Sequence, residues 1–225
     1  MSVKALKKAV WEANQGIFRA GLVTMHSGNA SGIDRARGLV AIKPSGMDYD
    51  KMRPSDMVVT DLNGRVVPNK GAATWKPSVD LPHHLYLYNN RPDIGGVIHT
   101  HSNYATSFAA LGRSIPALLT AIADEFGGEI PCVPYVDNQG DNIGQAILEH
   151  IGASPAVLLA HHGAFAVGKT PRDALKAAVM LEDVAHTCHL ALLKGDPQPL
   201  PADEIKKWFD RYHSSYGQPE KKRSK

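Results

Sequence analysis

The sequence has few of the features that mark secreted or membrane proteins. Only two of its 225 residues are cysteines, Cys132 and Cys188, too few for a disulfide framework and suited to a reducing compartment. No run of about 18 apolar residues could cross a bilayer. The first twenty residues interrupt their apolar positions with Lys, Glu and Gln, so they lack the continuous apolar segment of a secretory signal. We therefore expect a cytoplasmic protein with no membrane partner.

Charge of one sign is not in large excess either. The formal net charge is +3, and much of the excess lies in the C-terminal residues Lys221, Lys222, Arg223 and Lys225. An excess confined to a tail is not the basic patch that binds nucleic acid, so no nucleic-acid partner is expected. No linker or repeat divides the chain. The sequence predicts one domain over 1–225, with 219–225 as a flexible basic tail.

Apolar periodicity indicates interleaved helices and strands. Helices are expected over 3–20, from about Asp80, over 105–112, and from Thr170 to Gly195. Strands are expected at 22–24, 39–43, 95–102 and 156–163, with 27–38 as a loop and a hairpin turning at Asn63-Gly64 within 57–67. The hairpin implies antiparallel pairing, and the elements follow no regular βαβ rhythm. A mixed sheet covered by helices, an α/β (α+β) fold, fits this pattern.

Two histidines, His99 and His101, end the apolar run of the strand expected at 95–102. Residues i and i+2 of a strand share a face, with Cα atoms roughly 6.5–7 Å apart, so one metal ion could take both rings. The pattern alone equally fits two exposed polar side chains. A zinc site needs a third ligand, and the strand end at His161 and His162 offers two candidates. Asp80 could add a carboxylate or simply cap its helix.

The other paired histidines on predicted helices have a simpler interpretation. They are expected to be surface or packing residues, namely His83, His84, His186 and His189.

Three short turns repeat a composition that can bind phosphate. They are Ser27-Gly28-Asn29, Lys43-Pro44-Ser45-Gly46 and Lys76-Pro77-Ser78. Backbone N–H groups, hydroxyls and a cation hold a phosphate, and glycine lets the backbone approach it. Each segment alone also fits an ordinary β-turn. Beside a candidate metal motif, the three together favour a phosphorylated, oxygen-rich substrate.

An ordered set of motifs resembles a known family. The set comprises Gly28-Asn29, IKPSGMDY from Ile42, KPSVD from Lys76, HTHS from His99, IPC from Ile130, HHG from His161, and Tyr216-Gly217-Gln218. Together they resemble the class II aldolase/adducin superfamily, and within it the ribulose-phosphate 4-epimerases. The resemblance implies a three-layer α/β/α sandwich on a mixed, largely antiparallel sheet. It also implies a homotetramer with active sites between subunits.

The resemblance further implies a role for individual residues. The metal ligands would be Asp80, His99, His101 and His162, which selects His162 over His161. The substrate and its phosphate would contact Gly28, Asn29, Lys43, Ser45, Gly46, Ser78 and Val79. The acid/base groups would be Asp124 and Tyr216, with Tyr216 supplied by a neighbouring subunit. Three imidazoles suit Zn²⁺, with Mn²⁺ or Co²⁺ as alternatives.

These roles predict an epimerase of a pentulose phosphate, which cleaves and re-forms the C3–C4 bond because the C4 hydrogen is not acidic. The alternatives are a class II aldolase of the fuculose-phosphate type, which releases the aldehyde, and a non-catalytic adducin-like scaffold. The sequence departs from the family pattern at Val79, which replaces a second serine, at Ala160, which replaces a histidine, and at Ile122 and Glu125 beside Asp124. The segments after Cys132 and before Tyr216 are also short. These departures concern the identity of the substrate more than the metal chemistry.

Overall fold

A seven-stranded sheet forms the centre of the molecule in the computed structural model, which describes residues 2–68 and 75–217. The strands lie in the order β3-β2-β1-β4-β7-β6-β5. They are β1 (Asn29–Asp34), β2 (Leu39–Ile42), β3 (Val58–Asp61), β4 (Gly96–Thr100), β5 (Cys132–Val133), β6 (Ala156–Leu159) and β7 (Gly163–Gly168). Neighbouring strands are antiparallel except β5 and β6, which are parallel. The predicted mixed, largely antiparallel sheet is confirmed.

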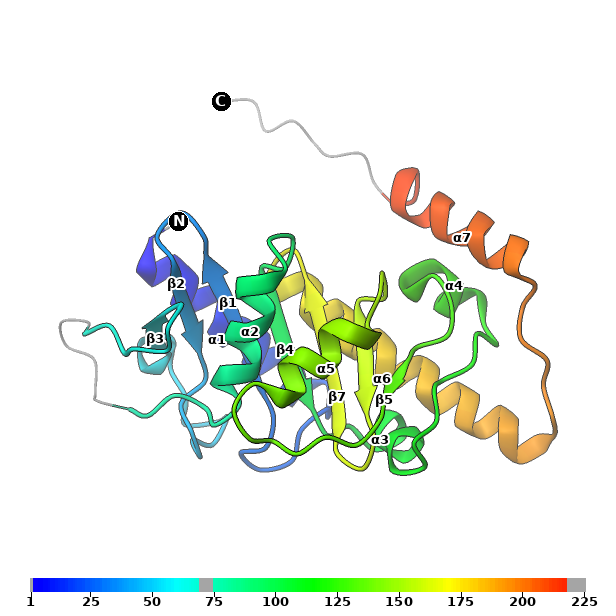
Figure 1. The fold of residues 1–225 in the computed structure, drawn as a ribbon, viewed down its shortest axis with the longest axis horizontal. Helices are drawn as coiled ribbons and strands as arrows, with labels where there is room; N and C mark the ends of the chain where they lie inside the picture. Colours follow the sequence, from blue (N-terminus) through cyan, green and yellow to red (C-terminus); the bar gives the residue numbers. More distant parts are fainter. Residues whose placement is uncertain (1, 69–74, 218–225) are drawn as a thin grey trace.

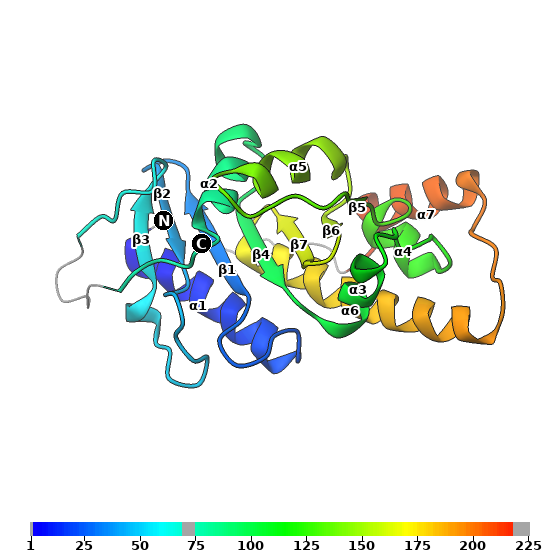
Figure 2. The same cartoon turned by 60° about the horizontal axis from the view of Figure 1, so that its bottom comes forward.

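Helices cover both faces of this sheet, as Figure 1 and Figure 2 show. They are α1 (Val3–Arg19), α2 (Leu81–Asn90), α3 (Asn103–Ala110), α4 (Thr120–Phe126), α5 (Asn142–His150), α6 (Pro171–Lys194) and α7 (Ala202–Ser214), with a short 3-10 helix at Pro54–Asp56. One apolar layer joins α1, α3 and α6 to strand residues such as Ile98 and Ala166. The alternate residues, such as Val97 and Phe165, face α2 and α5. The α/β/α sandwich is therefore confirmed.

None of the helices in the described part of the chain is long and apolar enough to cross a membrane. The predicted basic tail, residues 219–225, lies outside the described residues.

The N-terminal helix anchors the strand that carries Asn29. Its apolar stripe recurs every three to four residues and is buried at Leu6, Val10, Ala13 and Ile17. Asn14, also buried, donates from Nδ2 to the Ala30 carbonyl at 3.0 Å and accepts from the Ala30 N–H at 2.9 Å. These two bonds join α1 to β1 one residue beyond Asn29.

Two predictions in this region were wrong. Residues 29–34, expected within a loop, form β1, and residues 22–24 are not a strand. The sequence of β1, Asn-Ala-Ser-Gly-Ile-Asp, has little apolar character, yet all six residues are buried. They are buried because β1 pairs with β2 on one side and with β4 on the other. That placement depends on distant strands, so local composition did not indicate it.

Several elements were not predicted at all: α4, β5, α5, β7 and α7. The predicted hairpin is only partly present, since the turn forms at Gly64 but its returning arm is limited to a single bridge between Thr60 and Val66. α7 has no buried residue and packs on α4 at one end of the molecule (Figure 1).

Candidate metal and substrate site

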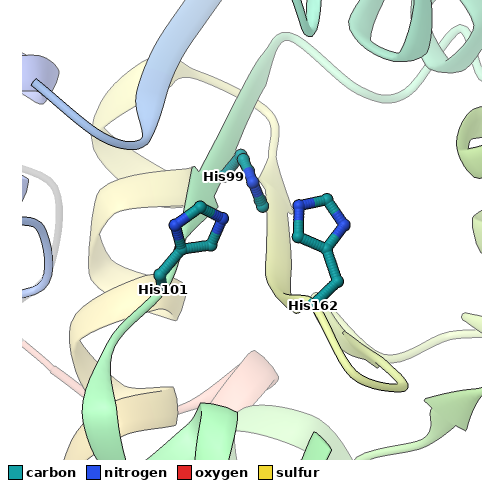
Figure 3. Close-up of side chains that lie close together, drawn as sticks. All are labelled: His99, His101 and His162. Atoms are coloured by element: carbon teal, nitrogen blue, oxygen red, sulfur yellow. The ribbon is translucent and has the colours of Figure 1, made fainter. Parts of the chain in front are cut away.

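Three histidines converge at one end of the sheet. His99 and His101 lie at the end of β4, and His162 lies in the tight turn from β6 to β7, the antiparallel neighbour of β4. The ring centroids are 4.6 Å (His99–His101), 4.8 Å (His99–His162) and 5.3 Å (His101–His162) apart. One potential ligand atom from each ring lies within 4.8 Å of the others. Figure 3 shows the three rings facing a common space.

The neighbouring His161 does not join this group. Its backbone has a left-handed φ of 60°, and its exposed ring lies 6.3 Å from Tyr135. The structure therefore brings His162 to the pair and leaves His161 out, in agreement with the choice that the family resemblance made.

The buried ring of His99 has a defined tautomer. Its Nδ1 lies 3.0 Å from the Ala164 carbonyl oxygen, which can only accept, so Nδ1 carries the proton and Nε2 keeps its lone pair. Burial lowers the pKa of His99 to about 3, and burial also lowers the pKa of His101 and His162 below the usual value. All three rings are thus neutral near pH 7. A divalent metal requires neutral imidazoles, so this donor set fits a metal ion.

A glycine makes room for this arrangement. A Cβ atom on Gly163 would lie 2.5 Å from the Thr100 carbonyl oxygen and 2.7 Å from the His101 ring. Real Cβ atoms do not approach other atoms so closely, so only glycine lets the start of β7 pack against the end of β4.

A polar cluster lies beside the histidines. Asn29, the register partner of His99, donates from Nδ2 to Asp80 Oδ2 at 2.6 Å and to Ser78 Oγ at 3.1 Å. Burial would raise the pKa of Asp80, but the nearby His99 and His84 rings and the hydrogen bond from Asn29 hold it below its usual value. The Asp80 side chain makes no cap hydrogen bond to α2, so the capping alternative is not supported. Its carboxylate instead accepts from Asn29, and it is not among the potential ligand groups that lie within 4.8 Å of one another, which are those of the three histidines.

The prediction that His83 and His84 lie on a helix surface was wrong, because both are buried. α2 is covered by the sheet on one side and by α5 on another, which leaves it little exposed surface. His84 Nδ1 lies 2.7 Å from Ser31 Oγ, which lies 2.7 Å from the Tyr88 hydroxyl. Burial lowers the pKa of His84 to about 3.

The predicted phosphate-binding turns lie together. The Ser45 N–H donates to the Lys76 carbonyl and the Ser78 N–H to the Lys43 carbonyl, both at 2.9 Å, so the two Lys-Pro-Ser segments pair side by side. Asn29 joins the third turn to them through Ser78. Ser45 and Gly46 are exposed, as is Val79, and Gly28 and Gly46 have left-handed φ values of 68° and 65°.

Lys43 and Tyr49 fix the turn that precedes Asn29. Lys43 is buried and donates from Nζ to the His26 carbonyl at 2.9 Å, and burial lowers its pKa to about 8. The Tyr49 hydroxyl lies 2.9 Å from the Ser27 carbonyl and 3.0 Å from the Gly28 carbonyl. The two side chains thus contact three consecutive carbonyls, and the single Tyr49 O–H is shared between two of them. The sequence reasoning did not identify Tyr49, although it ends the IKPSGMDY motif.

The two predicted acid/base residues lie elsewhere. Asp124 is on α4, half-buried, with an Oδ1 atom that has no hydrogen-bond partner among the described residues. Tyr216 follows α7, is 64% exposed and stacks on Tyr212 with centroids 4.8 Å apart. Within the described ranges, no hydrogen bond, ion pair or ring contact joins either residue to the three histidines. Gln218, the end of the Tyr-Gly-Gln motif, lies outside the described residues.

The residues that depart from the family pattern can also be located in the structure. Ile122 and Ala160 are buried apolar residues, and Glu125 forms an ion pair with Lys176 at 2.7 Å. None of the three belongs to the histidine cluster.

Fold and site together define a protein with the class II aldolase fold, in which histidines from the end of β4 and from the β6–β7 turn form a potential metal site. The chain belongs to the family described as "Class II Aldolase and Adducin N-terminal domain", whose model matches residues 8–189.

Named relatives cover nearly the whole chain. L-ribulose-5-phosphate 4-epimerase UlaF of Salmonella paratyphi B is 42% identical over 233 aligned positions, which cover 96% of this chain and 100% of that protein. The protein of the same name from Salmonella typhi is also 42% identical over the same coverage. Among solved structures, an L-fuculose 1-phosphate aldolase superposes with a TM-score of 0.82 at 30% identity, covering 93% of this chain and 96% of the other. YgbL of Klebsiella pneumoniae superposes with a TM-score of 0.79 at 25% identity, covering 92% and 99%.

Proposed function

We propose that the protein is a metal-dependent L-ribulose-5-phosphate 4-epimerase that produces D-xylulose 5-phosphate by cleaving and re-forming the C3–C4 bond. The observation that carries the proposal is the convergence of three neutral imidazoles beside the cluster of Asn29, Ser78 and Asp80. The 42% identity to relatives of that name supports the choice of substrate.

His99, His101 and His162 would hold the metal, with Asp80 as the carboxylate beside it. Zinc is the favoured ion because three imidazoles suit it, and Mn²⁺ or Co²⁺ are alternatives. A divalent ion there supplies Lewis acidity toward the negative charge that develops on the ketose oxygens when the C–C bond breaks.

The turns around the site would bind the sugar phosphate. Gly28, Asn29, Ser45, Gly46 and Ser78 offer backbone N–H groups, hydroxyls and an amide. Lys43 contributes by holding the turn before Asn29, and exposed Val79 lies beside Ser78. The buried Oδ1 of Asn29 has no hydrogen-bond partner among the described residues, so it is available to accept from a substrate hydroxyl.

Epimerisation needs an acid/base group on each face of the aldehyde, because re-addition to the other face points its oxygen the opposite way. Asp124 and Tyr216 would fill these two roles. Neither is connected to the histidines of its own chain, and Tyr216 is largely exposed, so we propose that Tyr216 acts in a neighbouring subunit. This arrangement requires a homo-oligomer, for which the family resemblance implies a tetramer.

Incubation of the metal-loaded protein with L-ribulose 5-phosphate tests the proposal. D-xylulose 5-phosphate should accumulate, and the product should be identified by coupled assay and NMR. Accumulation of dihydroxyacetone and glycolaldehyde phosphate without D-xylulose 5-phosphate would instead establish an aldolase. That second candidate is favoured by the superposition on L-fuculose 1-phosphate aldolase. No turnover together with no retained divalent metal would indicate the adducin-like scaffold.

A further inference from the structure

A carboxylate on α6 holds the start of the helix that follows the metal-site strand. Glu182 accepts from the Tyr104 N–H through Oε1 and from the Ala105 N–H through Oε2, both at 2.9 Å. These N–H groups belong to the first turn of α3, which begins two residues after His101. The contact therefore joins α6 to the backbone immediately after a proposed metal ligand.

The local sequence does not supply this cap itself. The first N–H groups of a helix lack partners within the helix, and a serine at the preceding position commonly accepts from one of them. Ser102 stands at that position but makes no cap hydrogen bond, and its buried Oγ has no partner among the described residues. Glu182 provides the acceptors instead, and its negative charge also suits the positive end of the helix dipole.

A second contact from α6 reinforces the first. The His186 ring, one helical turn beyond Glu182, stacks on the Tyr104 ring with centroids 3.8 Å apart and planes 16° from parallel. The first turn of α3 is thus held through both its backbone and a side chain.

The direction of the His101 ring depends on its own backbone more than the direction of the His99 ring does. The His99 ring is fixed by its hydrogen bond to the Ala164 carbonyl and by stacking on Phe165 at 4.5 Å. The exposed His101 ring makes no hydrogen bond to any described residue, so the chain segment from β4 to α3 sets its direction. Two residues separate that ring from the helix turn that Glu182 holds.

We propose that Glu182 is a positioning residue of the metal site, which fixes the segment between β4 and α3 and thereby aims the His101 ring at the metal. The inference rests on the metal site of the proposed function. It assigns Glu182 no contact with metal or substrate.

The test compares Zn²⁺ affinity with stability in the full chain. Glu182→Ala and Glu182→Gln are measured by competition with a chromophoric chelator, and thermal unfolding of the metal-free proteins is recorded in parallel. Loss of a residue that hydrogen-bonds a metal ligand typically weakens metal binding about 10–100-fold. Glu182 acts through the backbone that follows His101, so the lower value, about 10-fold, is expected for Glu182→Ala. Glu182→Gln keeps one acceptor oxygen, so its affinity should fall between those of Glu182→Ala and the unsubstituted protein.

Thr170→Ala is the matched control. Thr170 Oγ1 caps α6 by accepting from the Asp173 N–H at 3.2 Å, and it has no link to the histidines among the described contacts. This variant should lower the unfolding temperature and leave Zn²⁺ affinity unchanged. The visible absorption spectrum of bound Co²⁺, which reports ligand geometry, should change in Glu182→Ala and not in Thr170→Ala.

Two different failures are distinguishable. If the unsubstituted protein binds Zn²⁺ no better than His99→Ala, the metal site itself is wrong and the role of Glu182 is wrong with it. If the unsubstituted protein binds Zn²⁺ tightly and Glu182→Ala matches it within about twofold, the positioning role alone is rejected. An equal loss of affinity in Thr170→Ala also rejects it.

Discussion

Two regions of the molecule, the histidine cluster at the end of β4 and the pair of helices α4 and α7, differ in the contacts that one chain provides for their polar side chains. At the end of β4, potential ligand atoms of His99, His101 and His162 lie within 4.8 Å of one another, and a backbone carbonyl sets the His99 tautomer. In the second region, Asp124 lies on α4 and Tyr216 follows α7, and neither has a described contact to those histidines. The histidines contact one another within the chain, whereas Tyr216 is largely exposed and the Asp124 Oδ1 atom has no hydrogen-bond partner among the described residues. Under the proposed function, this difference means that the metal site forms within one subunit, whereas the acid/base groups act between subunits.

Removing one histidine should have the largest effect. His99→Ala should abolish Zn²⁺ retention and reduce epimerase activity by at least about 1,000-fold, because the most buried ligand is lost. Metal analysis of the purified variant and a coupled assay measure both quantities. His161→Asn is the control, since asparagine tolerates a left-handed backbone, and it should keep its metal. A His99→Ala protein with near-normal activity would discredit the ligand assignment.

Mixed oligomers test whether the second region acts across subunits. His99→Ala and Tyr216→Phe should each be nearly inactive as uniform assemblies. Co-expressed, they should recover about a quarter of the normal activity, because random assembly pairs an intact histidine site with an intact partner tyrosine in about one site of four. Co-expression of His99→Ala with His101→Ala should recover none. Absence of recovery in the first pair, with hybrid assembly verified by mass spectrometry, would place Tyr216 in its own chain's site or outside catalysis.

Acid should lower the stability of the metal-free protein in a predictable pH range. Burial lowers the pKa of both His84 and His99 to about 3 from an ordinary 6.5. Between those values the unfolded chain binds protons that the folded chain does not, so stability is full above pH 6.5 and falls as the pH decreases toward 3. The two residues should together lower the unfolding free energy of the metal-free protein by about 3 kcal/mol between pH 7.5 and pH 5.5. Urea unfolding at a series of pH values measures this loss, and His84→Gln should remove about half of it. A profile unchanged by His84→Gln contradicts the assignment.

The sequence predicted best where the signal was local and periodic. α1, α2, α3 and α6 lie close to their predicted ranges because each has an apolar stripe, a cap or a terminal glycine. The pairing of His99 with His101 followed from strand alternation. In contrast, β1 has small and polar residues whose burial depends on partners far away in the sequence, and it was mistaken for a loop. His83 and His84 were assigned to the surface because nothing local indicates that α5 covers α2.

Long-range contacts explain what sequence reasoning missed at the site. Tyr49 acts on a turn about twenty residues earlier, and Glu182 caps a helix 77 to 78 residues earlier. No local sequence pattern indicates contacts between residues so far apart in the chain. Asp124 and Tyr216 came from the family resemblance alone, and their catalytic roles stay predictions.

The missing Cβ of Gly163 has a consequence for redesign of this enzyme. Any side chain there would strike the Thr100 carbonyl and the His101 ring, so directed evolution toward new sugars should hold this codon constant. The exposed Val79 and Ser45 are the better places to randomise, since their side chains are not enclosed by other atoms.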